Sequence, residues 1–322
     1  MKRLLARRRT IGPRLFWLAP LLALPMPLLL NPYQQFVVNL VLMYIPVGIG
    51  FNVVVGNLGL FAFSNVAYFG IGAYTAGILM LKAGLPWWVT VLPAGAAGGI
   101  AGFLTSIPAL RGVRFFYLAI MTLAFGELMR WIYIRWEWAT GGSMGMSVPR
   151  PDLFGWTLGD VGKFYVFLAL AIAVVVATGR LLGSRYGRAF MAIRGHETAA
   201  AAMGIHTGRM IVIGFAWGGF VVGIGGAMYA ALIGHISPDS FDLTELILEF
   251  AIIMVGGLGS LLGSVIGAVV LTALPQFFSS LPGFDELAFG VLIILVLLFL
   301  PRGLASLLAR AHPIFRDRYF KE

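Results

Sequence analysis

The sequence predicts an all-α membrane protein, a polytopic bundle of about ten helical spans, or eight if two segments are re-entrant. Of its 322 residues, 60% are apolar and only 11% are charged, whereas a soluble domain carries about 25% charged residues. The mean hydropathy is +0.92, and apolar runs close to the roughly 20 residues that cross a bilayer recur from end to end. Because the hydrocarbon core holds no water, each span must satisfy its own backbone as a helix.

The apolar runs divide the chain into a basic N-terminal segment (1–14), a transmembrane domain (15–301) and a basic C-terminal tail (302–322). We expect spans near residues 15–30, 36–55, 63–81, 86–107, 115–136, 163–181, 210–233, 244–258, 261–280 and 284–300. Glycine is frequent in 56–81 and 244–280, and these are the segments that we expect to be broken or re-entrant.

Basic residues gather in short blocks between the apolar runs: at 1–14, at 111–114, at 180–209 and at 302–322. Most acidic residues lie at the opposite ends of the spans. Since Lys and Arg concentrate in cytoplasmic loops, both termini are predicted to be cytoplasmic, which requires an even number of spans. The net charge of +10 follows from this topology and does not indicate binding to nucleic acid.

The chain contains 42 glycines, and several repeat every four residues. Lipid gives helices no hydrophobic reason to associate, so small residues at this spacing allow close packing. The clearest helix-packing ladder is Gly259, Gly263 and Gly267. The sequence VGNLG at 55–59 also recurs as VGGLG at 255–259, which is either an internal repeat of the kind found in transporters or a chance match.

Polar residues at membrane depth are costly and need a reason. Glu127 and Arg130 lie one helical turn apart and pair on one face, either to brace the bundle or to line a solute path. Uncharged polar groups in other spans either contact a polar solute or join helices. The candidate solute path comprises Asn57, Ser64, Asn65, Tyr68, Glu127 and Arg130.

A further acidic group is predicted at the outer side. Glu245 and Glu249 share a helix face (i, i+4) near the outer end of their predicted span. The candidate outer docking face, which would line the outer mouth or contact a partner protein, comprises Asp239, Asp242, Glu245, Asp285 and Glu286.

Catalytic patterns are missing from the sequence. With no cysteine, neither a disulfide nor a thiolate metal site can form. No H-E-x-x-H, G-x-S-x-G or phosphate-binding G-x-x-x-x-G-K-[ST] motif occurs. We therefore predict no catalytic residue, no metal and no cofactor in this chain. If ATP drives its function, the ATPase is a separate chain.

The longest cytoplasmic loop, 183–209, contains GRAFMAIRGHETAAAAMGIHTGR from Gly187. Its Ala-rich part, 197–203, favours a helix, and Gly204 suits the C-terminal cap. A short helix with basic flanks either docks into a partner's groove or lies on anionic lipid.

The order G-R-x-x-x-A-I-R followed by E-x-A-A-x-x-M-G resembles the cytoplasmic coupling loop of LivM-type permeases, membrane subunits of ABC importers for branched-chain amino acids and related solutes. Further similarities lie at 56–60, 69–74, 117–123, 140–142 and 256–263, over most of the chain. Two places depart from the family pattern. Gly195 and His196 stand where acidic residues are usual, and the outer loop 143–162 has no matching pattern.

The resemblance implies a permease subunit in the bacterial inner (plasma) membrane, working by alternating access. Its partners would be a LivH-like sister permease, two ATPase subunits that bind ATP, and a periplasmic or extracellular solute-binding protein. The ATPase coupling residues would be Gly187, Arg188, Arg194, Glu197, Ala199, Ala200 and Gly204. The alternative is a self-contained channel or secondary transporter for a small neutral solute, and the absence of paired mid-membrane acids in the predicted spans argues against ion coupling.

Overall fold

The computed structural model describes residues 25–28, 30–113, 115–153 and 155–278, together with 290, 294, 298 and 303–306. Most of the predicted first and last spans and most of both predicted tails lie outside these residues, as do Asp285 and Glu286 of the candidate docking face.

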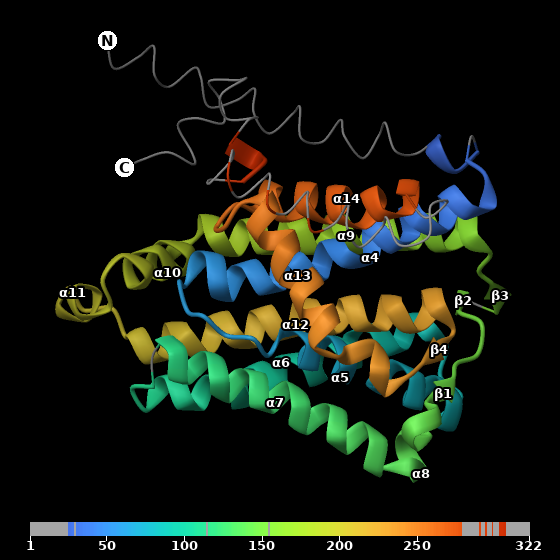
Figure 1. Ribbon diagram of the computed structural model, residues 1–322, viewed down its shortest axis with the longest axis horizontal. Helices are drawn as coiled ribbons and strands as arrows, with labels where there is room; N and C mark the ends of the chain where they lie inside the picture. The colour runs from blue at the N-terminus through green and yellow to red at the C-terminus, as the bar shows by residue number, and fades with distance from the viewer. Residues whose placement is uncertain are drawn as a thin grey trace.

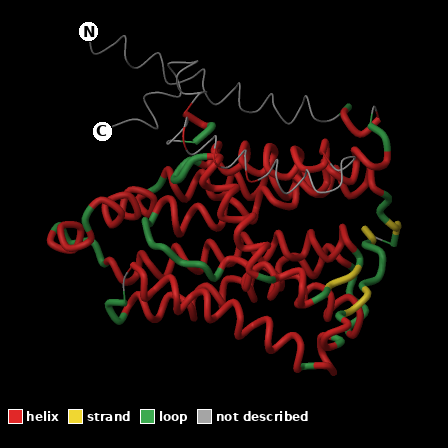
Figure 2. Tube along the Cα trace, viewed as in Figure 1, coloured by secondary structure: helices red, strands yellow, loops and turns green. Residues whose placement is uncertain are grey.

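The described chain is helical almost throughout (Figure 2). Its long helices are α4 (Pro32–Asn52), α5 (Asn65–Lys82), α6 (Trp87–Leu110), α7 (Phe115–Arg135), α9 (Asp160–Gly183), α12 (Thr207–Ile233), α13 (Leu243–Gly256) and α14 (Leu261–Phe278). The shorter helical elements are η2 (Met26–Leu28), the π-helical turn η3 (Val53–Asn57), α8 (Glu137–Thr140), η4 (Gly142–Met144), α10 (Arg185–Gly195), α11 (Glu197–Ala202) and η5 (Pro238–Phe241).

Most of the long helices run roughly along one direction, in two groups, and α13 runs across them (Figure 1). α4 packs against α9 and α14, and α12 packs against α5 and α6. α4 also packs against α12, which joins the two groups, while α13 lies against α4 and α14. Every predicted span in the described part corresponds to a helix, so the polytopic all-α bundle is confirmed.

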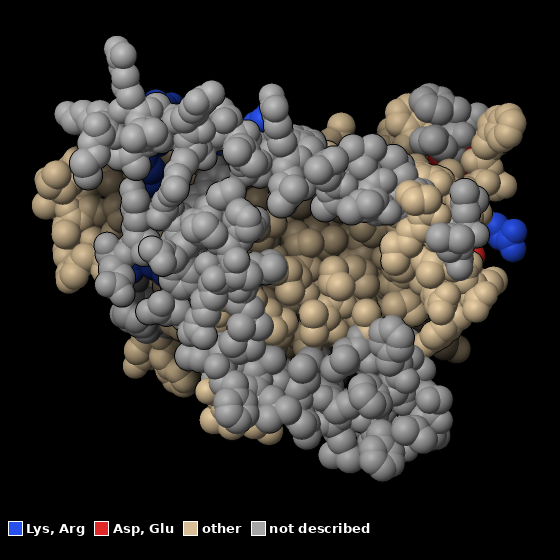
Figure 3. Space-filling view, turned by 90° about the horizontal axis from the view of Figure 1, so that it is seen from above, with Lys and Arg blue, Asp and Glu red and all other residues tan. Residues whose placement is uncertain are grey.

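Among the described residues, five helices are long and apolar enough to cross a bilayer: Pro32–Asn57, Trp87–Leu110, Phe116–Arg135, Asp160–Gly183 and Thr207–Ile233. The count of eight to ten spans and the cytoplasmic termini stay predictions. In Figure 3 the surface between the two ends of the bundle is mostly uncharged. Visible Lys and Arg side chains lie mainly toward the end with α10 and α11, and visible acidic ones at the opposite end.

Glycines allow α12 to contact its neighbours backbone to backbone. A Cβ at Gly219 of α12 would overlap the carbonyl oxygen of Gly98 in α6, and one at Gly226 would overlap that of Phe69 in α5. On the α4 side, a Cβ at Gly218 would lie 2.9 Å from the carbonyl oxygen of Gly50. α12 therefore approaches three helices closely because it has no side chain at the points of contact.

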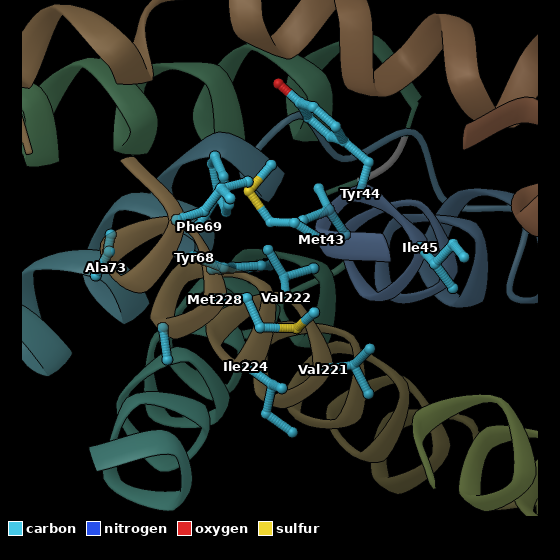
Figure 4. Packing of buried hydrophobic residues seen from close by; sticks show 14 of the residues in the cluster. Met43, Tyr44, Ile45, Tyr68, Phe69, Ala73, Val221, Val222, Ile224 and Met228 are labelled. Carbon is cyan, nitrogen blue, oxygen red and sulfur yellow. The ribbon is translucent and has the colours of Figure 1, made fainter. Parts of the chain in front are cut away.

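Apolar side chains fill the space around these contacts. Met43 of α4, Phe69 of α5, and Val222 and Met228 of α12 are fully buried and point into one cluster (Figure 4). Trp87 at the start of α6 is also fully buried, and its indole N–H donates to the carbonyl of Ala227 at 2.8 Å. The largest core thus lies where α4, α5, α6 and α12 converge.

The predicted glycine ladder is only partly helical. Gly263 and Gly267 of α14 lie against α13, where a Cβ on either would overlap the backbone of Gly256 or Ile252. Gly259 instead lies in the turn between α13 and α14 with φ of +80°, a conformation that favours glycine. The four-residue spacing therefore identified two packing positions and one turn position.

The predicted coupling loop, 183–209, holds two helices, α10 and α11. Ser184 caps α10, because its hydroxyl accepts a hydrogen bond from the amide of Tyr186 at 3.1 Å. His196 is extended and separates the helices, and Gly204 follows α11 with φ of +84°. The predicted Ala-rich helix and its glycine are confirmed, while α10 is an addition to the prediction.

Four two-residue strands lie at the end of the bundle opposite to α11 (Figure 1). β1 (Met146–Ser147) pairs with β4 (His235–Ile236), and β2 (Asp152–Leu153) pairs with β3 (Trp156–Thr157), both antiparallel. These pairings hold the loop 143–162 in place, a segment in which the sequence showed no family pattern.

Replacing Gly219 by alanine tests the backbone contact between α6 and α12. We expect Gly219→Ala to lower the free energy of unfolding by about 1–3 kcal/mol, the usual cost of overpacking. Gly183→Ala, at the end of α9, is the matched control, since a Cβ there meets no atom within 4 Å. Thermal unfolding in detergent, followed by size-exclusion chromatography, measures both variants. Equal midpoints would contradict the prediction.

Candidate functional site

The two similar glycine-rich segments, 55–59 and 255–259, meet in space at the end of the bundle that carries α10. Asn52, one turn before the first segment, joins them. Its amide nitrogen donates to Ser260 O at 2.9 Å and to Ser264 Oγ at 2.7 Å, and its amide oxygen accepts from Gly259 N at 2.8 Å. Asn57 adds a bond to Gly259 O at 3.2 Å. One buried polar joint therefore connects α4 to the α13–α14 turn.

Arg194, the last basic residue of α10, lies against both segments. Its Nη1 donates to the carbonyl oxygen of Gly56 at 2.5 Å. A Cβ at Gly59 would lie 2.8 Å from Arg194 Cγ, and one at Gly259 would lie 2.6 Å from Nη1. Glycines with positive φ at both positions thus leave the room that the arginine occupies. A single side chain from the cytoplasmic loop contacts both turns.

The apolar face of α10 fixes the loop to the bundle. Phe190 and Ile193 are buried beside Leu58, Ile211 and Phe215. These contacts set the position from which Arg194 reaches the turns.

The predicted coupling residues fall into inward and outward groups. Gly187 is buried, and a Cβ there would overlap the backbone of Leu182, while Ala200 is the buried residue of α11. Arg188, Ala199 and Gly204 are exposed, and Glu197 is partly exposed. The loop therefore presents an outer surface, while Arg194 connects it to the interior.

Two glutamates of α13 lie inside the bundle. Glu249 is fully buried and accepts a hydrogen bond from Asn65 Nδ2 at 2.9 Å. Glu245 is partly buried and accepts one from Tyr44 Oη at 3.2 Å. α13 has only 14 residues, about 21 Å of helix, and both acids lie in its N-terminal half, as the sequence predicts. Their position at the outer side of the membrane stays a prediction.

Other predicted path residues are bonded within the bundle. Ser64 Oγ donates to Tyr68 Oη at 2.7 Å, and Tyr68 Oη also bonds to Thr105 of α6. Ser64, Asn65 and Tyr68 are all buried. In this conformation they join α5 to α6 and α13, which is the second of the roles that the sequence left open.

Arg130 joins the two predicted charged groups. It lies 3.9 Å from Glu127, as the i, i+3 spacing predicts, but its closer partner is Asp239 of η5, at 2.8 Å. Asp242, by contrast, caps α13 by accepting from the amide of Glu245 at 3.0 Å. The candidate docking face is therefore divided: Asp239 belongs with Arg130, Asp242 with a helix end, and Glu245 with the interior.

Sequence reasoning missed five residues of these networks: Tyr44, Asn52, Thr105, Ser260 and Ser264. Asn52 carried a usable signal, since it is a lone amide in an apolar run four residues before Gly56. Thr105 and Ser260 gave none, because their partners are distant in sequence. Within the described ranges, no three His, Cys, Asp or Glu side chains are grouped so as to hold a metal ion.

These features define a class: a helical membrane protein with glycine-packed spans, a buried polar joint and a helical loop in contact with that joint. Over residues 35–301 the chain matches the family described as branched-chain amino acid transport system, permease component. It belongs to this family, and it is a transport permease, not an enzyme.

Curated relatives agree. The chain is 31% identical to the permease protein LivM of the high-affinity branched-chain amino acid transport system of Escherichia coli (strain K12), over 92% of this chain and 75% of that one. The LivM of Salmonella typhimurium is 32% identical over the same shares. The permease protein LivH of Escherichia coli is 26% identical, over 81% of this chain and 90% of its own. No solved structure matches.

A double-mutant cycle tests the joint. Asn52→Ala and Ser264→Ala remove the same hydrogen bond, so we expect the two losses of stability to be non-additive, with a coupling of at least about 0.5 kcal/mol. Thermal unfolding of the wild type, both single variants and the double variant gives the value. Asn52→Ala with Thr178→Ala of α9 is the matched control pair, for which additivity is expected. Additive losses at Asn52 and Ser264 would disprove the bond.

Proposed function

We propose that this chain is a membrane permease subunit of an ATP-driven importer, and that it forms part of the path for branched-chain amino acids or a related small polar solute. Family membership supports the first part, and the transport systems to which the relatives belong support the solute class. The proposed membrane is the inner (plasma) membrane of a bacterium. A self-contained channel or secondary transporter is the alternative that the family match disfavours.

The proposed partners follow from the same argument. A sister permease similar to LivH completes the path, and two ATPase subunits that bind ATP dock beneath the loop 183–209. A solute-binding protein delivers the solute at the opposite end. No cofactor is assigned to this chain, whose lipid contacts are provided by the apolar outer faces of its helices.

The contact of Arg194 with both glycine-rich turns is the observation that carries the coupling mechanism. When an ATPase subunit moves α10 and α11, Arg194 moves with them because it belongs to α10, and Phe190 and Ile193 pass the movement to Leu58, Ile211 and Phe215. Arg194 bonds to the turn after α4 and touches the turn before α14. Displacement of one helix therefore reaches two helix pairs at once, as rigid-body alternating access requires.

The proposed solute path includes the Glu127, Arg130 and Asp239 cluster. A zwitterionic amino acid carries one ammonium and one carboxylate, and the cluster offers charges of both signs on partly exposed side chains. The buried residues Asn57, Ser64, Asn65 and Tyr68 would contribute by holding the helices that carry this cluster.

Arg194→Gln tests the coupling role. We expect at least about tenfold slower uptake in proteoliposomes, because a hydrogen bond from a charged donor contributes about 1.5–3 kcal/mol and 1.4 kcal/mol is a factor of ten. Arg209→Gln, which removes an exposed cytoplasmic arginine at the start of α12, is the charge-matched control. Both variants should co-purify with the ATPase. Normal uptake by Arg194→Gln would remove the assigned role, and an active chain that purifies with no ATPase partner would refute the importer.

A charge exchange tests whether Arg130 lines the solute path or only stabilises the bundle. Arg130→Asp and Asp239→Arg together restore the ion pair, so we expect the double variant to regain thermal stability relative to either single one. Uptake should remain low, because the solute then meets charges in reversed positions. Thermal unfolding and uptake kinetics measure the two effects. Recovery of uptake along with stability would show that the pair only braces the bundle.

A further inference from the structure

An extended segment, Gly59–Ser64, connects the end of η3 to α5. The amide of Leu60 donates to Val54 O at 3.2 Å, and that of Phe63 donates to Thr122 Oγ1 of α7 at 2.8 Å. Between these bonds the chain comes to the surface, where Phe61 is 45% exposed. The segment is thus non-helical and reaches the outside of the bundle at Phe61, while Leu60, Ala62 and Ser64 are buried.

The segment lies at membrane depth. Thr122 is two helical turns into α7, about 10 Å from its start at the rise of an α-helix, and the basic residues of the adjoining loop precede that start. Phe63, bonded to Thr122, is at the same depth. Non-helical backbone at this depth does not face lipid; it is covered by protein or lines a water-filled space.

α7 shows a second feature that lipid would not tolerate. In Figure 1 it lies at the edge of the bundle and diverges from it toward α8. Glu127, about 18 Å from the start of α7, has 56% of its side chain exposed. The large exposed side chains of α6, such as Leu92, Ile100 and Phe103, are apolar, and exposed apolar side chains such as Leu128 also surround Glu127 on α7. α6 therefore offers a lipid surface, whereas a carboxylate exposed near mid-membrane excludes lipid from this face of α7.

The two features belong to one surface. The ring of Phe63 packs edge-on against Phe250 of α13 at a centroid distance of 5.5 Å, so the extended segment lies between α7 and α13. α13, which carries Phe250, also exposes Leu243 and Ile247. We define the open face by Phe61, Met121, Glu127, Leu243 and Ile247.

We infer that the open face is the surface by which this chain meets its sister permease, with the solute path running between the two chains. The inference rests on the proposed function and adds the contact surface to it. The partner must lie within the membrane, which excludes the ATPases and the binding protein. A chain of the same family carries an equivalent face, as the similarity to both LivM and LivH indicates.

Two such faces meeting about a pseudo-two-fold axis form a nearly self-complementary interface. The extended segments and the Glu127 positions of the two chains then face each other or a shared aqueous space, and neither faces hydrocarbon.

Site-specific photocrosslinking tests the surface. Because the chain contains no cysteine, a single introduced cysteine is the one position in this chain that a maleimide labels. Single cysteines at Phe61 and Ile247 are compared with single cysteines at Leu92 and Ile100 of α6, which are at least as exposed. Each variant is assembled with its sister permease and ATPase, shown to retain uptake in proteoliposomes, labelled with benzophenone maleimide and irradiated. Mass spectrometry identifies the adducts.

We expect adducts with the sister permease from positions 61 and 247, and with lipid alone from positions 92 and 100. Lipid adducts alone from 61 and 247, adducts with a second copy of this chain, or sister adducts from α6 would each overturn the assignment while the active complex upholds the importer. Failure of the unlabelled wild type to assemble with a sister permease and an ATPase would overturn the proposed function and the open face with it.

Discussion

Close approach of helix backbones around α12 is the constraint on which the rest of the bundle depends. Lipid gives helices no hydrophobic reason to associate, so their packing relies on contact at short range. Three glycines of α12 make these contacts: Gly219 with the backbone of Gly98, Gly218 with that of Gly50, and Gly226 with that of Phe69. These contacts hold α4, α5 and α6 in fixed positions. The fixed positions of these helices in turn determine where the polar joint, the loop 183–209 and the charged cluster lie.

The polar joint connects α4, α10 and the α13–α14 turn within a small volume. Asn52 uses both its donor and its acceptor on the α13–α14 turn, and Arg194 occupies the space that Gly59 and Gly259 leave free. Since buried polar groups are costly to leave unpaired, the two turns are held in register. A movement of α10 is thereby transmitted to α4 and to α14. An importer that is driven by a separate ATPase chain needs this property.

The polar residues at membrane depth divide by exposure. Glu249, Asn65, Ser64 and Tyr68 are buried and satisfied by one another or by neighbouring helices. Glu127, Arg130 and Asp239 remain partly exposed. The first group fixes helix positions, and the second lies at the surface of the bundle. Exposure, which depends on the whole bundle, separates two kinds of residue that look alike in the sequence.

The sequence by itself determined the class, the helices and the family. Composition excludes a soluble fold, apolar runs delimit the spans, and the motif order around Arg194 identifies the permease family, because these signals are local in the chain. Tertiary structure alone decided which residues meet. Hydrogen bonds connect Glu249 to Asn65, Arg130 to Asp239, and Arg194 to Gly56, and the partners in each pair are more than a hundred residues apart in the sequence. No local pattern encodes such pairs, since they arise only when glycine-lined helices bring distant segments into contact.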